Sequence, residues 1–226
     1  MAIERSSDLR PFRTADGSFT LRSEVFNEAY HSVHGAVIES THVFIKAGLD
    51  HVAEKGSTPI ELLEVGLGTG LNMLLTWIRC LEGKCEVNYT ALEPFPLAAA
   101  TLSELSYWND LAWPGLQEPF MELMSTVDRR VHTGGFSFLQ RSLPVQQFNE
   151  RSKYDLVYFD AFGPNTAPDM WTAEVLQRVF LAMRPGGVLV TYCAKGEVRR
   201  ILASIGLQVE RLKGPPGKRE MIRATK

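Results

Sequence analysis

Three acidic side chains stand at the ends of short apolar runs, where a carboxylate can bind a ligand or accept a proton. Glu64 lies in the run 60–65, Glu93 follows the run 86–92, and Asp160 follows the run 154–159. If these runs are neighbouring strands, the three acids share the edge of the sheet where α/β proteins bind ligands. Burial there would raise the pKa of Asp160 toward that of a useful base. The alternatives are an N-cap or loop hydrogen bond for Asp160 and a solvated side chain for Glu93.

A glycine-rich turn follows the first of these runs. Glycines stand at 66, 68 and 70, and residues 72–78 continue as the opening of a helix. Glycine lets the backbone approach a ligand closely, and a helix start presents free N–H groups. A dinucleotide fingerprint would need its third glycine at position 71, where this chain has leucine. The turn therefore predicts a nucleotide-binding crevice of another kind, although a glycine turn without a ligand is an alternative.

The elements that must position these residues alternate from residue 60 onward. Apolar runs predict strands at 60–65, 86–92, 130–133, 154–159, 188–192, 207–212 and 218–224. Helices are expected at 70–81, from 96, at 136–143, 172–183 and 195–204, with an irregular insertion at 109–119. This order predicts a doubly wound α/β sheet of Rossmann-like type. The last two strands are joined by a short turn, so one edge strand should be antiparallel.

The residues before this alternation are expected to form an extension. Residues 1–58 should hold a hairpin around Asp16-Gly17, a polar loop at 30–35 and a helix at 36–49 ended by Gly48. This extension would pack on a core domain at 59–226.

Composition limits the classes of function. The 226 residues suffice for one ordinary domain, and three cysteines cannot complete a set of disulfides. No run has the length of a transmembrane helix or the character of a signal peptide, so we expect a cytoplasmic protein without a membrane contact. His31 and His34 have the spacing of a metal pair, but no cluster of acids or cysteines accompanies them, and no metal is expected.

The formal net charge of −2 is unevenly distributed. From residue 184 to 226 there are ten Lys or Arg against three acids, a local balance of +7. Such a basic face suits a polyanionic partner, although solvated helix and strand faces would explain the charge equally well.

Four blocks of sequence resemble a known family. They are 30–32 with 39–44; 64–72; 159–164 with 168–171; and 191–196 with 218–221. The second resembles the first motif of class I S-adenosylmethionine-dependent methyltransferases. Together the blocks are similar to the MnmC-like family, which methylates the aminomethyl group on the wobble uridine of tRNA. Larger relatives fuse this domain to a flavin-dependent oxidase, for which this sequence lacks the length, so a stand-alone methyltransferase is expected.

The resemblance implies a set of site residues. It implies Asp160 as the catalytic group that orients the amine and accepts its proton. Contacts to S-adenosylmethionine are implied for Glu64, Gly66, Gly68, Gly70, Asn72, Glu93, Gly135, Phe136 and Asp160. Contacts to the tRNA substrate are implied for Tyr30, Ser32, Phe162, Lys195, Lys218 and Arg219. Gly135 stands where the family usually has an acid that helps hold adenine, so backbone groups or Phe136 would replace it.

Two other functions remain open from the sequence. A spermidine synthase-like aminopropyltransferase shares the expected fold and the acid at 160, but such enzymes usually carry Gly-Gly-Gly-Asp-Gly in the first motif. A non-catalytic tRNA-binding protein could keep the fold without the chemistry. The basic C-terminal third is expected to hold tRNA, and the protein is expected to be a monomer or a small homo-oligomer.

Overall fold

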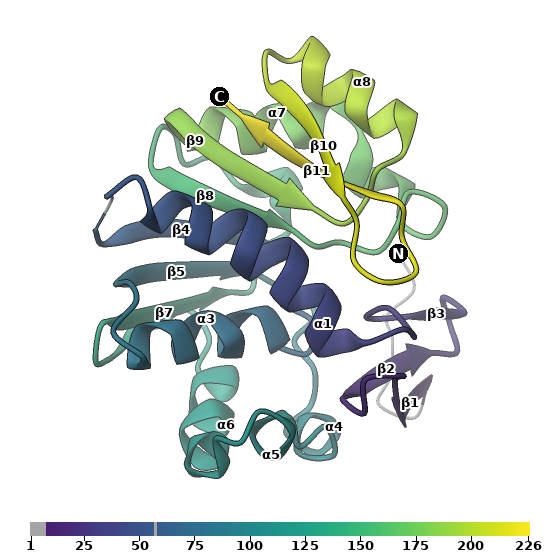
Figure 1. The fold of residues 1–226 in the computed structure, drawn as a ribbon, viewed down its shortest axis with the longest axis vertical. Helices are drawn as coiled ribbons and strands as arrows, with labels where there is room; N and C mark the ends of the chain where they lie inside the picture. The colour runs from purple at the N-terminus through teal and green to yellow at the C-terminus, as the bar shows by residue number, and fades with distance from the viewer. Residues whose placement is uncertain (1–7, 57) are drawn as a thin grey trace.

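The computed structural model describes residues 8–56 and 58–226, and its central feature is an eight-stranded sheet (Figure 1). The strand order is β10-β11-β9-β8-β4-β5-β7-β6. Five central strands are parallel: β4 Ile60–Val65, β5 Val87–Leu92, β7 Phe136–Arg141, β8 Tyr154–Phe159 and β9 Met183–Thr191. The outer strands β6 Val131–Thr133, β10 Gln208–Lys213 and β11 Glu220–Thr225 pair in antiparallel fashion, and β10 and β6 are the two edges. The doubly wound α/β prediction is confirmed, and a second antiparallel edge is added at β6.

The strands are apolar on both faces because helices cover both sides of the sheet. Successive residues of a strand point to opposite faces, so Tyr158 packs in one core and Phe159 in the other. The first core is covered by α3 Leu71–Leu81 and by the N-terminal helix. The second is covered by α7 Ala173–Ala182 and α8 Gly196–Ser204. Thr172 caps α7 by accepting a hydrogen bond from the Val175 N–H.

The N-terminal helix is longer than the sequence predicts. It comprises α1 Ala36–Ser40, a wider π-helical segment η2 Thr41–Asp50, and α2 His51–Ala53, without interruption. The expected end at Gly48 is wrong. Gly48 instead lets the helix approach the sheet: a Cβ there would lie 3.0 Å from Val190 Cγ2 and 3.2 Å from the Tyr158 ring. The close packing of helix on sheet explains the glycine.

Two further predictions of local structure are wrong. The residues predicted as a helix at 136–143 begin with strand β7, which pairs in parallel with β5. The residues predicted to be irregular at 109–119 lie among short helices whose buried side chains include Trp108 and Phe120. Those helices are α5 Tyr107–Asp110, η3 Pro114–Leu116 and α6 Gln117–Ser125, and they follow α4 Ala99–Ser103. The remaining short helices are η4 Val145–Gln147 and η5 Pro168–Trp171.

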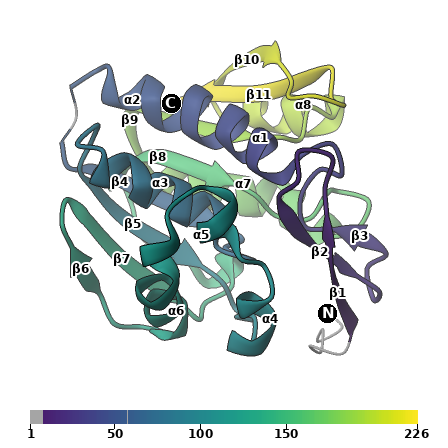
Figure 2. The same cartoon turned by 60° about the horizontal axis from the view of Figure 1, so that its bottom comes forward.

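A small antiparallel sheet precedes the long helix. It consists of β1 Leu9–Arg13, β2 Phe19–Ser23 and β3 Glu28–Ala29, with the predicted hairpin turn between the first two strands. Figures 1 and 2 place this sheet beyond the carboxyl ends of the central strands, and an ion pair between Arg13 and Asp110 joins β1 to α5. It therefore brings the loop after β3 over the edge of the main sheet. None of the helices in the described ranges combines the length and the apolar character needed to span a bilayer.

Candidate functional site

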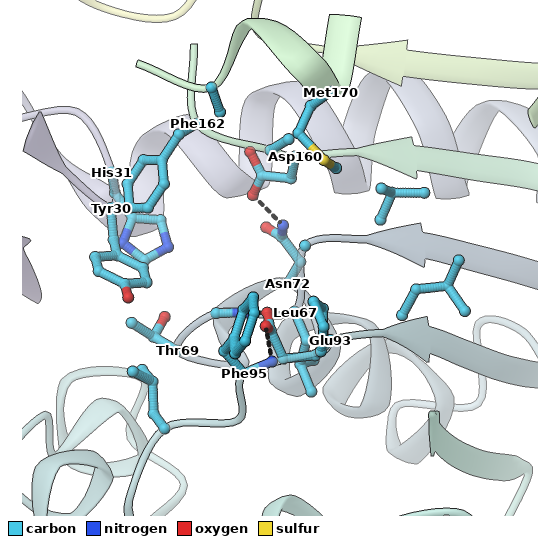
Figure 3. Close-up of a pocket in the computed structure, with 18 of the residues that line it drawn as sticks. Tyr30, His31, Leu67, Thr69, Asn72, Glu93, Phe95, Asp160, Phe162 and Met170 are labelled. Carbon is cyan, nitrogen blue, oxygen red and sulfur yellow. Dashed lines mark hydrogen bonds between the residues drawn. The ribbon is translucent and has the colours of Figure 1, made fainter. Parts of the chain in front are cut away.

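A cavity of about 1030 Å³ opens at the carboxyl ends of the central strands (Figure 3). Its walls come from the N-terminal sheet and the loop after β3, from α1, from the loops after β4, β5, β7, β8 and β9, and from the turn between β10 and β11. Of the predicted site residues, those that line it are Tyr30, Ser32, Gly66, Gly68, Asn72, Glu93, Asp160, Phe162 and Lys218. At this edge of the sheet the fold brings together residues that are far apart in the sequence, up to 188 positions for Tyr30 and Lys218.

The glycine turn runs along the cavity wall. Gly66 has φ +91°, and a Cβ there would lie 2.7 Å from the carbonyl oxygen of Asp160. Gly68 has φ +50°, and a Cβ would lie 3.1 Å from the Tyr30 ring. Both positions therefore require glycine, for conformation and for space. At Gly66 and Gly68 the turn therefore presents backbone without side chains to the cavity.

Glu93 connects the glycine turn to the next loop. Its two carboxylate oxygens accept hydrogen bonds from the backbone N–H groups of Gly68 and Phe95, both at 3.0 Å. These bonds fix the carboxylate at the cavity wall. That arrangement suits a pair of ribose hydroxyls, which are hydrogen-bond donors.

A buried hydrogen-bond ladder supports Asp160 from below. The amide nitrogen of Asn72 donates to Asp160 Oδ2 at 2.8 Å, as Figure 3 shows, and to Glu64 Oε1 at 2.9 Å. Tyr89 donates its hydroxyl hydrogen to Glu64 Oε2 at 2.7 Å, and burial raises the pKa of Glu64 well above its ordinary value. Asn72 Oδ1 is buried at the cavity without a hydrogen-bond partner among the described residues. It is an acceptor that a bound ligand can satisfy.

Asp160 is poised to exchange a proton near neutral pH. Burial and, secondarily, the charge of Glu39 raise its pKa from 3.8 to about 7, against the opposing hydrogen bond from Asn72 and the charge of Lys218. The backbone is fixed as well, since Asp160 donates its N–H to the Val65 carbonyl at 3.0 Å. A carboxylate of this kind can accept a proton from an amine.

Aromatic rings form the wall beside Asp160. Phe162 packs edge-on against Tyr30 with ring centroids 5.0 Å apart, and tilted against Phe26 at 5.4 Å. The loop that carries Phe162 is held by the Trp171 indole, which donates to the Phe162 carbonyl at 2.8 Å. Figure 3 shows Tyr30, Phe162 and Asp160 around one side of the cavity. This wall suits a flat, unsaturated ring.

Several predicted site residues lie elsewhere. Gly135 and Phe136 stand at the start of β7, at the opposite end of the sheet, so the prediction that they hold adenine is wrong. The true carboxyl end of β7 is Arg141, and Ser142 is the residue after it that lines the cavity. Glu64 and Gly70 lie behind the cavity wall: Glu64 supports Asn72, while Gly70 makes room for Met124.

Lys195 and Arg219 are exposed and do not line the cavity. The Lys195 ammonium donates to Asn165 Oδ1 at 2.6 Å, so it meets the loop after Asp160. Both residues are therefore outside the reaction cavity, in positions open to a macromolecule.

The sequence reasoning missed other residues that line the cavity: Phe26, His31, Glu39, Phe95 and Met170. The sequence did contain a clue to Glu39: its helical spacing places this acid on the same face as the buried residues Ala36, Ser40 and Val43. A charged residue on a buried helix face is unusual. His31 Nδ1 is hydrogen-bonded to the Thr20 hydroxyl at 2.9 Å. Burial lowers the pKa of His31 to about 4, so its ring is neutral at physiological pH. The described residues contain no group of three or more His, Cys, Asp or Glu arranged to hold a metal.

The strand order, the glycine turn and the acid after the second strand are typical of the class I S-adenosylmethionine-dependent methyltransferase fold. The family model described as S-adenosyl-L-methionine-dependent methyltransferase matches residues 139–226. The cofactor is therefore S-adenosylmethionine, and the structure fits it through the close backbone turn, the fixed Glu93 carboxylate and the unpartnered Asn72 Oδ1.

Within this class the chain resembles the MnmC proteins over most of its own length. It is 30% identical over 214 residues, 89% of this chain, to the "tRNA 5-methylaminomethyl-2-thiouridine biosynthesis bifunctional protein MnmC" of Pseudomonas fluorescens. The protein of the same name from Aromatoleum aromaticum is 30% identical over 223 residues. The chain spans 32% and 34% of the lengths of these two relatives.

Solved structures agree on the fold. The structure of MNMC2 from Aquifex aeolicus superposes with a TM-score of 0.75 and 25% identity, covering 96% of this chain and 70% of that one. The spermidine synthase from Thermotoga maritima has a TM-score of 0.56 and 11% identity over 96% of this chain and 68% of that one, which is a likeness of fold alone.

Proposed function

We propose that this protein transfers a methyl group from S-adenosylmethionine to the primary amine of 5-aminomethyluridine or its 2-thio form at the wobble position of tRNA. The observation that carries the proposal is the Asp160 carboxylate, with a pKa of about 7, beside the aromatic pair Tyr30 and Phe162. The names of the MnmC relatives support the substrate class. A tRNA substrate is also consistent with the cytoplasmic location expected from the sequence.

The chemistry assigns Asp160 a specific task. Bound S-adenosylmethionine supplies a methyl group already activated by its sulfonium charge. An amine with a pKa near ~10 must lose a proton at neutral pH before it can attack, at a cost of roughly 4 kcal/mol. Asp160 orients that amine and accepts its proton, and the surrounding apolar walls exclude water and lower the cost of the neutral amine.

The aromatic wall supports a position for the base in this proposal. Modified uridines in single-stranded loops are commonly held by stacking on aromatic side chains. Phe162 is two residues from Asp160 in the loop after β8, so a base against Phe162 directs its substituent toward the carboxylate. Tyr30 and Ser32 complete this side of the cavity from the loop after β3.

The basic segment at residues 184–226 supplies contacts to the tRNA backbone through only part of its charge. Five of its ten cations already have a partner within the protein: Arg184 pairs with Asp155, Arg211 with Glu220, Lys218 with Glu39, Arg223 with Glu210, and Lys226 donates to carbonyl oxygens. Four others make no ion pair with any described residue: Arg199, Arg200, Lys213 and Arg219. We assign phosphate binding to these four and to Lys195.

The proposal is tested by incubating the protein with labelled S-adenosylmethionine and two preparations of one tRNA, with and without the aminomethyl group. Transfer to the aminomethyl tRNA alone is the expected result. A parallel reaction with decarboxylated S-adenosylmethionine and putrescine tests the aminopropyltransferase alternative, and product there without transfer to tRNA would replace the proposal. tRNA binding without S-adenosylmethionine binding, measured by calorimetry, would favour the non-catalytic alternative.

A further inference from the structure

An ion pair at the cavity wall joins the N-terminal helix to the turn between the last two strands. Glu39, on α1, is 5% exposed, and its Oε1 accepts a hydrogen bond from the ammonium group of Lys218, 179 residues away in the turn between β10 and β11. Both residues line the cavity. A carboxylate with so little contact to water is costly to bury, so its placement there calls for a role.

Each partner of this pair also contacts a different wall of the cavity. Glu39 Oε2 accepts a hydrogen bond from the Ser32 N–H at 2.7 Å, which fixes the loop that carries Tyr30 and Ser32. The Lys218 ammonium lies 3.9 Å from the centre of the Tyr192 ring. The Tyr192 hydroxyl in turn donates to the carbonyl of Ala161 at 2.8 Å, next to Asp160.

We propose that the Glu39–Lys218 pair is a positioning device for methyl transfer, which sets the loop at 30–32 against the loop at 160–162 and fixes the charge that faces Asp160. The inference rests on the proposed function for its purpose, because it assumes that Asp160 is the group that receives the amine proton. Neither residue needs to touch the reacting atoms for this role.

The electrostatic part of the proposal follows from the groups that face Asp160. They come from every element packed against it: Glu39, Lys218, Asn72, Glu64, Tyr192 and Tyr89. Glu39 raises the pKa of Asp160 and Lys218 lowers it, so the two members of the pair act in opposite directions. Their balance helps hold the carboxyl near its value of about 7.

The test is a pH titration of Asp160 in the cofactor-free protein, followed through the ¹³C resonance of its carboxyl group and assigned with Asp160→Asn. Glu39→Gln should lower the midpoint by about 1 pH unit, because a negative neighbour is removed. Lys218→Met should raise it by about the same amount, because Glu39 then stands unbalanced. Lys218→Arg keeps the charge and should titrate like the wild type.

The matched control is Glu220→Gln, which breaks the Arg211–Glu220 pair on the same hairpin. It should leave the midpoint unchanged. Equal midpoints in Glu39→Gln and wild type, or shifts of the same sign in Glu39→Gln and Lys218→Met, would overturn the proposal. If Lys218→Met does not fold, Glu39→Gln and Lys218→Arg still decide it.

The titration needs neither cofactor nor tRNA, so its outcome is separate from that of the proposed function. Where methyl transfer is measurable, the pH at which kcat reaches half its maximum should move in the same directions as the titration midpoints. Unmoved kcat profiles alongside shifted midpoints would contradict the assignment of Asp160 as the proton acceptor and leave the pair without its proposed purpose.

Discussion

Replacing Asp160 with asparagine should separate catalysis from stability. The substitution removes the proton acceptor but keeps an oxygen that can accept the hydrogen bond from Asn72 Nδ2, now 2.8 Å long. The bond between the Asp160 N–H and Val65 is unaffected, since it belongs to the backbone. We therefore expect the fold and the S-adenosylmethionine site to persist, and turnover to fall by about 10²- to 10⁴-fold, the usual contribution of a general base.

The same substitution should stabilise the protein above neutral pH. The pKa of Asp160 rises from 3.8 to about 7 on folding, so the folded state binds the proton more tightly than the unfolded state. The free energy of unfolding of the wild type therefore falls as pH rises through this window, and the full penalty is present above pH ~7. The pKa change corresponds to about 4 kcal/mol at most, and to about 2 kcal/mol where water reaches the carboxyl.

Urea unfolding at two pH values measures this effect. Asp160→Asn should exceed the wild type by about 2 kcal/mol in its free energy of unfolding near pH ~8, and the difference should vanish as pH falls toward 4. Calorimetry of S-adenosylmethionine binding supplies the control for an intact site. Wild-type turnover in this variant, or a variant less stable than the wild type at pH ~8, would refute the reasoning.

Three other predictions concern the rest of the site. Glu93→Gln should weaken S-adenosylmethionine binding by about 10- to 100-fold, because a charged acceptor for the ribose hydroxyls is lost; an unchanged calorimetric Kd would remove Glu93 from the site. Phe162→Ala should raise the KM for tRNA by about 10-fold through lost stacking while the Kd for S-adenosylmethionine stays the same, and the opposite pattern would place this ring against the cofactor. Replacing both Arg199 and Arg200 with glutamine should weaken tRNA binding and reduce its salt dependence by about one charge per residue, whereas the ion-paired Arg211 should matter little; equal effects would contradict the assignment of phosphate contacts.

The central part of the fold was readable because its signals are local. The runs that became β4 and β8 are short, apolar and bounded, and the positions of Gly66 and Gly68 fix the turn that follows β4. The acids at the ends of the strands could be predicted for the same reason, because the direction of the chain alone determines which edge of a parallel sheet carries the carboxyl ends. Asp160 and Glu93 consequently lie where the sequence places them.

Other features depend on packing partners that the sequence does not show. Phe136 begins a strand because β5 pairs with it in parallel, with Phe136 opposite Val87. The residues expected to hold adenine therefore lie at the amino ends of the strands, away from the cavity. Gly48 lies inside a helix, where glycine is usually unfavourable, because the sheet packs too closely against the helix to leave room for a side chain. Glu39 was overlooked as a site residue because its partner Lys218 is 179 positions away.

The atom that receives the methyl group identifies the reaction that the protein catalyses. tRNA carrying 5-aminomethyl-2-thiouridine is incubated with the protein and trideuteromethyl-labelled S-adenosylmethionine, digested to nucleosides and fragmented by mass spectrometry. We expect the label on the nitrogen of the aminomethyl group, with labelling strongly reduced in Asp160→Asn. Label on the ribose or on a ring atom, or no transfer by a protein that binds both S-adenosylmethionine and this tRNA, would contradict this expectation.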